Sequence, residues 1–523
     1  MYRHFSPANP DMSKFYVTTA IDYVNARPHL GTAYEKIGAD CLARYKRLAG
    51  FDTYFLMGTD EHSTNVEREA RNLGKDPQAY TDEMAVVFER TWKSLHISYD
   101  DFIRTTEPRH KLAVARLFKE IHKQGFIYEG TYSGLYCEGC EEFKVEKDLV
   151  DGKCPRHLTV PKFIEERNYF FALSKFSEPL KKHILAHPGF IRPEMRKNEI
   201  LNVIESGLED VSVSRAGKTW GVPLPIAPGQ VVYVWFDALI NYISAIGYGS
   251  DEAKDQQLFQ RYWPCDVHVI GKDITRFHCL IWPAMLMAGG VELPESVFGH
   301  GFVYNRGEKM SKTLGNIVDP ENLAAFFGAD ALRYLLLREI AFDRDGDFTV
   351  ELFVTRYNAE LANELGNLFS RTLSMTQRYF EGNVPAESAE SKRELARLTE
   401  GVVEDYRREM EVLAFDRALA ALWRAVQDAN RFVEERKPWA QAKSGDREAL
   451  GATLRALLEV LRLSSVLCQP FMPEKAKEMR SQLGLLSEFS LADAQKTAGA
   501  DWKRIAGASA VLFPRIESEE KSK

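Results

Sequence analysis

The chain has 523 residues, which is more than one ordinary domain contains, so we expect two to four domains. Its 45% hydrophobic and 27% charged residues are typical of a soluble globular protein, and no run reaches the roughly 18 apolar residues that a membrane span requires. The net charge of −7 does not exclude a nucleic-acid partner, because phosphate contacts need only a local basic face. The first 14 residues lack a targeting pattern, so we expect a cytoplasmic protein with no membrane partner.

The first third of the chain alternates between strand-like and helix-like segments. Residues 14–20 form a β-rich run, a Gly/Pro/His turn follows at 27–31, and apolar residues recur three and four positions apart at 37–48. A second strand is predicted at 53–57. Strand, turn, helix and strand in this order are typical of a parallel βαβ unit.

The strand pattern returns at 267–270 and 297–304, after a segment of different character, and it stops near residue 351. Helical apolar faces follow, for example at 415–426 and 454–461. We therefore predict an α/β protein, in which an insert divides a Rossmann-like parallel-sheet domain and an α-helical bundle comes last. The predicted boundaries are 1–124 and 226–350 for the two halves of the sheet domain, 125–225 for the insert, 351–515 for the bundle and 516–523 for a disordered tail.

The motif Pro28-His29-Leu30-Gly31-Thr32 lies at the predicted junction of a strand and a helix. The first turn of a helix offers free N–H groups and the positive end of the helix dipole, which suit a phosphate. Gly31 would let a nucleotide approach the backbone, and the imidazole of His29 can donate a hydrogen bond to it. A His-x-Gly tripeptide also occurs by chance, so this motif alone leaves a purely structural role open.

A second motif, Lys309-Met310-Ser311-Lys312-Thr313, lies in a loop flanked by glycines. Two lysines at this spacing can bracket a triphosphate and stabilise the negative charge that grows on a departing pyrophosphate. The alternative is a solvated basic loop. The two motifs belong to the first and last portions of one divided α/β domain, where ligands gather at the carboxyl ends of the strands.

This pair of motifs resembles the signatures of the class I aminoacyl-tRNA synthetases, His-Ile-Gly-His and Lys-Met-Ser-Lys-Ser, which hold ATP. The chain departs from the first signature at Thr32, whose hydroxyl can donate a hydrogen bond but carries no charge, and from the second at Thr313. The resemblance implies that His29, Lys309 and Lys312 are catalytic. It also implies an ATP-binding set of His29, Gly31, Thr32, Lys309, Ser311 and Lys312.

Four further segments resemble the methionyl-tRNA synthetases, and this resemblance spans nearly the whole chain. They contain Ile21-Asp22-Tyr23, Gly58-Thr59-Asp60-Glu61-His62, the aromatic stretch 233–242, and 271–282. Sulfur–aromatic contacts suit a methionine side chain, and one carboxylate, that of Asp60, suits its ammonium group. The implied methionine-binding set is Ile21, Tyr23, Asp60, Trp235, Ala238, Tyr242, Ile274, His278 and Trp282.

The implied activity is that of a methionine–tRNA ligase, which uses ATP with Mg²⁺. L-methionine attacks the α-phosphate of ATP to give methionyl-adenylate and pyrophosphate, and the terminal adenosine of tRNA(Met), including the initiator, then accepts the methionyl group. An enzyme accelerates such a reaction mainly by positioning its substrates and by stabilising the negative charge that develops on the phosphates.

Two groups in the helical third resemble the family's anticodon-binding positions. Asn363, Asn367 and Arg371 recur every four residues, and Pro438-Trp439 follows a second predicted helix. Polar groups and one aromatic ring are what unstacked RNA bases require. We expect Trp439 to project from a helix boundary because Pro438 redirects the chain. The alternative is that Trp439 caps the helical core.

The seven cysteines are too few and too scattered for a disulfide framework. Three of them belong to two half-sites in the insert, Cys137-x-x-Cys140 and Cys154-x-x-His157. This spacing is typical of a closed, structural, tetrahedral zinc site, so we expect one Zn²⁺ per chain. It resembles the single-knuckle zinc insert of some methionyl-tRNA synthetases; unliganded thiols are the alternative. The other four cysteines are expected to be buried small hydrophobic residues.

The sequence leaves several other functions to consider. Class I synthetases for leucine, isoleucine or valine carry a larger insert, and the cysteine enzyme places zinc in its amino-acid site. A non-catalytic RNA-binding relative would have no need of His29, Asp60 and both lysines. A dehydrogenase is disfavoured because no G-x-G-x-x-G follows the first strand. The chain ends soon after the helical bundle, so a monomer is expected.

Overall fold

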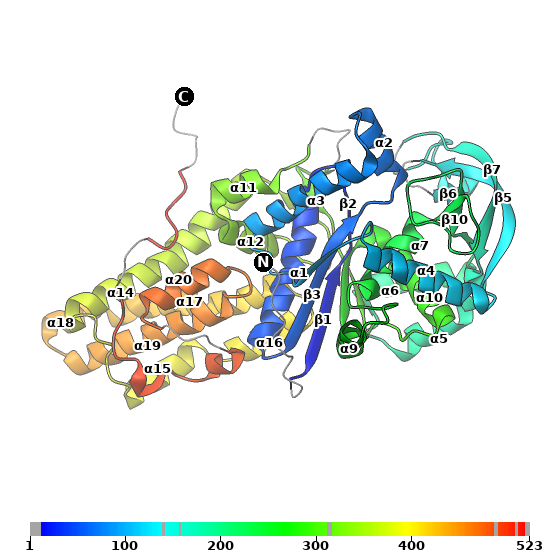
Figure 1. Ribbon diagram of the computed structural model, residues 1–523. Helices are drawn as coiled ribbons and strands as arrows, with labels where there is room; N and C mark the ends of the chain where they lie inside the picture. Colours follow the sequence, from blue (N-terminus) through cyan, green and yellow to red (C-terminus); the bar gives the residue numbers. More distant parts are fainter. Residues whose placement is uncertain are drawn as a thin grey trace, which may run out of the picture.

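The computed structural model describes residues 12–138, 142–155, 158–310, 316–485, 490–507 and 511–517. A seven-stranded parallel sheet forms its centre, with the strand order β2-β3-β1-β12-β13-β8 and with β4 paired to β3 (Figure 1). The expected α/β class is confirmed. The strands are β1 Lys14–Thr19, β2 Asp22–Tyr23, β3 Asp52–Asp60, β4 Asp101–Arg104, β8 Ile191–Arg192, β12 Val267–Gly271 and β13 Val297–His300.

Strand β1 joins the two halves of this sheet. Val17 pairs with Phe55 of β3 on one side and with Val267 of β12 on the other. The strand order therefore reverses at β1, between a strand from the first half of the chain and one from the second. Ligands of such sheets bind in the crevice at the carboxyl ends of the strands beside this point.

Helices cover both faces of the sheet because successive strand residues point to opposite sides. Val17 and Phe55 join one buried cluster, whereas Tyr16 and Leu56 join another. Helices α1 Leu30–Leu48, α2 Thr64–Asn72, α3 Pro77–Ser94, α11 Pro320–Phe327 and α12 Ala329–Glu339 contribute to the first cluster. Helices α4 Pro108–Lys123, α7 Val234–Ala238, α8 Asn241–Ser244, α9 Ala253–Tyr262 and α10 Trp282–Gly289 contribute to the second.

The insert forms a second, antiparallel sheet with the order β6-β5-β7-β9. Its strands are β5 Ile127–Cys137, β6 Glu142–Lys144, β7 Lys162–Phe171 and β9 Val211–Ser212. Strand β8, from the same segment, instead pairs in parallel with β13 of the main sheet. The segment 125–225 thus also supplies one strand to the main sheet. The sequence did not predict β8, because two residues are too few to show an alternating pattern. The remaining elements of this segment are α5 Ser177–Ala186, α6 Glu194–Glu205 and β10 Ser214–Ala216, and β10 pairs with β11 Gln230–Val232 beyond the predicted end of the insert.

A small sheet, β15-β14-β16, links the main sheet to the helices. It contains β14 Val303–Asn305, β15 Glu308–Lys309 and β16 Gly346–Phe348. Beyond β16 the structure assigns only helices to the residues it describes, as the sequence predicted. No helix in the described ranges is long and apolar enough to cross a membrane.

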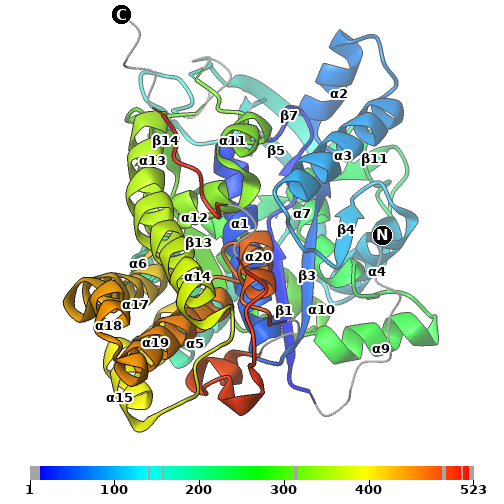
Figure 2. The ribbon, with the colours of Figure 1, turned by 90° about the vertical axis from the view of Figure 1, so that its left-hand side faces the viewer.

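The C-terminal helices form a bundle beside the first face of the main sheet (Figures 1 and 2). The predicted apolar face of α17 is confirmed, since Phe415, Leu419 and Trp423 are buried. Helix α19 lies at the centre of the bundle and buries even Arg455 and Glu459, which form an ion pair of 2.8 Å. The helices are α13 Val350–Arg356, η5 Tyr357–Gly366, α14 Asn367–Phe380, α15 Ala389–Leu398, α16 Val402–Glu411, α17 Phe415–Arg436, α18 Pro438–Ser444, α19 Arg447–Leu467 and α20 Pro473–Gln482.

Candidate active site

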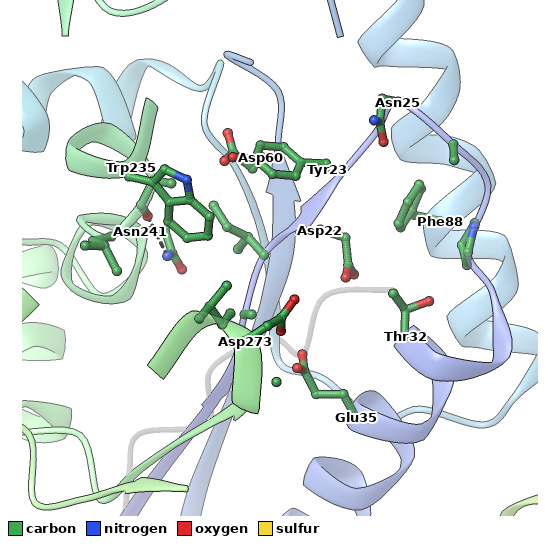
Figure 3. A pocket seen from close by; sticks show the side chains of 18 of the residues that line it. Asp22, Tyr23, Asn25, Thr32, Glu35, Asp60, Phe88, Trp235, Asn241 and Asp273 are labelled. Carbon is green, nitrogen blue, oxygen red and sulfur yellow. Dashed lines mark hydrogen bonds between the residues drawn. The ribbon is translucent and has the colours of Figure 1, made fainter. Parts of the chain in front are cut away.

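A cavity of about 300 Å³ opens at the carboxyl ends of β1, β3 and β12 (Figure 3). Its walls come from the β1–β2 turn, the start of α1, the end of β3, helices α7 and α8, and the segment that follows β12. This is the crevice beside the reversal of strand order. Eight of the nine predicted methionine-binding residues line it, namely Ile21, Tyr23, Asp60, Trp235, Ala238, Tyr242, Ile274 and His278.

Trp282, the ninth, does not line the cavity. It is fully buried behind Tyr242, with ring centroids 6.0 Å apart, and its indole N–H donates to Nε2 of His268 at 3.2 Å. Trp282 therefore supports the wall of the cavity and does not form its surface.

Aromatic rings form the outer wall of the cavity. Tyr23 meets Trp235 edge to face at 6.1 Å, and Trp235 stacks on Phe277 at 3.9 Å with an interplanar angle of 12°. In Figure 3 the rings of Tyr23 and Trp235 lie side by side above the cavity, next to Asp60. These faces are apolar and polarisable, which suits a thioether.

Hydrogen bonds hold His278, on the inner wall of the cavity, in its uncharged form. Nδ1 of His278 lies 3.0 Å from the carbonyl oxygen of Ile274, to which it donates, so Nε2 accepts from the hydroxyl of Tyr242 at 2.7 Å. Burial lowers the pKa of His278 to about 4. The imidazole is therefore neutral at physiological pH, and this end of the cavity suits an uncharged side chain.

Four carboxylates also line the cavity. Asp60, at the end of β3, is 3% exposed, and Asp22, Glu35 and Asp273 also face the cavity (Figure 3). Beneath them the buried Lys36 pairs with Glu35 at 2.7 Å and with Asp22 at 3.2 Å. Burial raises the pKa of Asp22 to about 6 although Lys36 opposes the shift. A buried carboxylate such as Asp60 can bind the ammonium group of an amino acid.

The backbone N–H groups in the first turn of α1 were expected to be free for a phosphate, but they already have partners. Nδ1 of His29 accepts hydrogen bonds from the N–H groups of Gly31 and Thr32, at 3.1 and 3.3 Å, and the N–H of Leu30 donates to the carbonyl of Val318 at 2.9 Å. These N–H groups are therefore not free for a phosphate, because a histidine at the N-cap already binds them. The same geometry makes Nε2 of His29 the protonated nitrogen, which can donate to a ligand.

The role expected for Gly31 also changes. Gly31 does not line the cavity, and a Cβ at this position would lie 3.0 Å from Cε1 of His29 and 3.8 Å from Cε of Met310. The glycine leaves room for the His29 ring, and Met310 of the second signature lies nearby. His29 and Thr32 do line the cavity.

Parts of the predicted set lie outside the described residues. These are Ser311 and Lys312 of the second signature and Cys140 and His157 of the zinc cluster; of Lys309 the structure describes the backbone only. Cys137 and Cys154, the two described members of the zinc cluster, are each 1% exposed. Cys41, Cys265, Cys279 and Cys468 are buried, as expected.

The predicted anticodon residues lie on the helical bundle, away from the cavity. Asn367 and Arg371 belong to α14, but Asn363 lies in η5, a π-helix, so the three residues do not share one regular α-helical face. Pro438 is buried at the first position of α18, which fits a backbone role. Trp439 is 41% exposed, which contradicts a core position, and the guanidinium of Arg371 lies 5.7 Å from its ring centroid.

Several cavity residues were not predicted as ligands from the sequence. Most of them lie beside residues that the motifs predicted, whereas Phe88 belongs to α3, where the sequence shows no motif. They include Asp22, Asn25, Arg27, Glu35, Phe88, Asn241 and Asp273.

Comparisons with known proteins agree with this geometry. The family model "tRNA synthetases class I (M)" matches residues 15–161 and 157–373, and the model "Anticodon binding domain of methionyl tRNA ligase" matches 384–523. The methionine–tRNA ligase of Caldanaerobacter subterraneus subsp. tengcongensis is 44% identical over 97% of this chain and 79% of the relative, and that of Thermosynechococcus vestitus is 44% identical over 91% of each. A solved structure of Mycobacterium tuberculosis methionyl-tRNA synthetase in complex with methionyl-adenylate superposes with a TM-score of 0.92, at 43% identity over 96% of this chain and all of that one. The chain therefore belongs to the methionyl-tRNA synthetases, a family of class I aminoacyl-tRNA synthetases.

Proposed function

We propose that this chain is a methionine–tRNA ligase whose first step takes place in the cavity at the reversal of strand order. One observation carries the proposal: an aromatic and uncharged wall and a buried carboxylate face the same 300 Å³ space, next to His29 of the first signature. The wall of Tyr23, Trp235 and Tyr242 suits the thioether, and Asp60 suits the ammonium group.

The substrate carboxylate then points toward the start of α1. There it attacks the α-phosphate of ATP, which enters with Mg²⁺, and methionyl-adenylate and pyrophosphate result. His29 donates from Nε2 to the nucleotide, and Lys309 and Lys312 stabilise the charge on the departing pyrophosphate. In the second step the terminal adenosine of tRNA(Met), initiator or elongator, attacks the activated carbonyl.

We further propose that the helical bundle reads the anticodon of this tRNA. The partial exposure of Trp439 and its position beside Arg371 support this role, since one ring can stack on a base and the guanidinium can supply hydrogen bonds. The exposed side chains of Asn363 and Asn367 add polar groups on neighbouring turns.

A structural zinc ion in the insert is also proposed, held by Cys137, Cys140, Cys154 and His157. Support comes from the donor chemistry, because two thiols buried in a loop-rich insert suit the Cys/His repertoire of zinc. When bound, such an ion holds the loops together and takes no part in catalysis. The monomeric state and the domain boundaries stay predictions.

ATP–pyrophosphate exchange tests the amino-acid specificity. We expect exchange by the purified chain to depend on methionine and to remain near background with leucine, isoleucine, valine or cysteine. Exchange that is faster with any of these four than with methionine would contradict the proposal.

A further inference from the structure

Arg27 lies at the mouth of the cavity, in the loop between β2 and α1 and two residues before the N-cap His29. Its side chain is exposed, and it forms no ion pair with any residue that the structure describes. Among the described residues that line the cavity, Arg27 is the only lysine or arginine. Neither signature motif includes it.

Thr32, which replaces the second histidine of the first signature, is committed within α1. Its hydroxyl accepts from the N–H of His29 at 3.0 Å and donates to the carbonyl of the same residue at 2.8 Å. This capping box stabilises the start of the helix but uses the hydroxyl's only proton. Thr32 therefore brings neither a charge nor a proton to a phosphate.

The backbone at the start of α1 does not compensate. The N–H groups of Leu30, Gly31 and Thr32 all donate to other protein atoms. None of these three N–H groups is available to a phosphate, so the start of α1 attracts an anion mainly through the helix dipole.

The carboxylates around the cavity would repel a phosphate group unless a cation lies nearby. Asp22, Glu35, Asp60 and Asp273 line it, and the buried Lys36 beneath them is already paired with the first two. A triphosphate adds about four negative charges, and the repulsion between like charges is stronger in a partly buried site than in water. A guanidinium matches a phosphate with two parallel hydrogen bonds and keeps its charge at every physiological pH.

We propose that Arg27 binds a phosphate group of ATP and supplies the positive charge that the second signature histidine would otherwise bring. The inference rests on the proposed function, since it requires ATP as the substrate of this cavity. Arg27 and Thr32 then act as a pair: a threonine is tolerated at position 32 because an arginine is present at position 27.

Methionine-dependent ATP–pyrophosphate exchange by the full chain tests this role, with Arg27→Gln, Arg27→Lys and the control Arg71→Gln. Arg71 is 77% exposed and pairs with Glu67 on α2, outside the cavity. We expect Arg27→Gln to lower kcat/KM for ATP by about ten- to a hundredfold, the loss that one charged hydrogen-bond partner produces. Arg27→Lys should retain part of the activity, and Arg71→Gln all of it.

Two further measurements separate phosphate binding from a structural effect. Adenosine, used as a competitive inhibitor, should keep its inhibition constant in Arg27→Gln, and the Kd for methionine should not change. Adding Thr32→His to Arg27→Gln should recover exchange several-fold. The proposal is overturned if Arg27→Gln stays within twofold of the wild type, if adenosine and ATP weaken equally, or if the double variant is no faster than Arg27→Gln. A wild-type chain without methionine-dependent exchange would instead refute the proposed function.

Discussion

Nδ1 of His62 lies 2.8 Å from Oδ2 of Asp237, and both side chains are buried. His62 follows the end of β3, two residues after Asp60, whereas Asp237 belongs to α7, which carries Trp235 and Ala238. Oδ1 of Asp237 is 2.8 Å from Nε2 of His110 on α4. One carboxylate thus connects the end of β3, which carries Asp60, to the helix that carries Trp235.

Loss of this carboxylate should destabilise the fold and displace the aromatic wall. In Asp237→Ala both histidines lose their acceptor, and we expect the free energy of unfolding to fall by about 3–5 kcal/mol, the usual cost of removing one partner of a buried polar pair. The KM for methionine should rise about tenfold, with a smaller change in the KM for ATP. Urea unfolding and exchange kinetics measure both. Asp251→Ala, whose side chain is 95% exposed, is the control and should change neither.

The same contact predicts a dependence of stability on acid. Burial alone would raise the pKa of Asp237, but His62 and His110 outweigh it and lower the pKa to about 2, below its ordinary value of about 3.9. Because the folded-state pKa is the lower one, the contribution to stability is complete above about pH 4 and is lost as the pH falls from about 4 to about 2. The stability difference between wild type and Asp237→Asn should therefore shrink by about 2 kcal/mol as the pH falls from about 4 toward 2. A difference that does not depend on pH would show that the charge of Asp237 is unimportant.

Trp439→Ala should separate the two steps of the reaction. The ring is 41% exposed, so its loss should leave the melting temperature and the rate of adenylate formation nearly unchanged. Affinity for tRNA(Met) should fall by about one to two decades, because stacking on a base contributes about 1–3 kcal/mol. Leu185→Ala removes another exposed apolar side chain, 60% exposed on α5, and should affect neither step. Parallel loss of both steps in Trp439→Ala would refute anticodon binding by this residue.

Metal analysis should find about one zinc ion per chain in reduced wild-type protein. Cys154→Ser should lose this zinc and make the insert more susceptible to proteolysis, because metal binding and local folding are coupled. Cys468→Ser replaces an equally buried thiol on the helical bundle and should retain the metal. A wild-type zinc content near zero would eliminate the site.

The sequence predicted the parts of the molecule that have a periodic pattern or a motif. The strands beside the cavity were predicted because β-rich runs of residues are bounded by turn residues, and the apolar face of α17 was predicted because its period of 3.6 residues repeats over several turns. Strand β8 was not, since two residues show no period. The capping role of His29 was missed because the same imidazole can donate to a phosphate or accept from backbone N–H groups, and only the backbone geometry decides between them.

The residues of the cavity were likewise predicted only where a motif contains them. Eight methionine-pocket residues were predicted because each stands in a motif, and the motifs converge at the strand ends. Trp282 was assigned one layer too close to the ligand, since a sequence does not distinguish a ring at the surface of a pocket from the ring behind it. The partnership of Asp237 with His62 and His110 joins residues that are 175 and 127 positions apart, and no local pattern reports such a contact.

Pyrophosphate exchange by Asp60→Ala is the sharpest test of whether this cavity activates methionine. Asp60 is 3% exposed and is the carboxylate proposed to hold the substrate ammonium. We expect Asp60→Ala to remain folded and to lose about a hundredfold or more in kcat/KM for methionine, the equivalent of about 3 kcal/mol. Asp251→Ala should exchange at the wild-type rate. Near-wild-type exchange by Asp60→Ala would show that methionine is not held by Asp60 in this cavity.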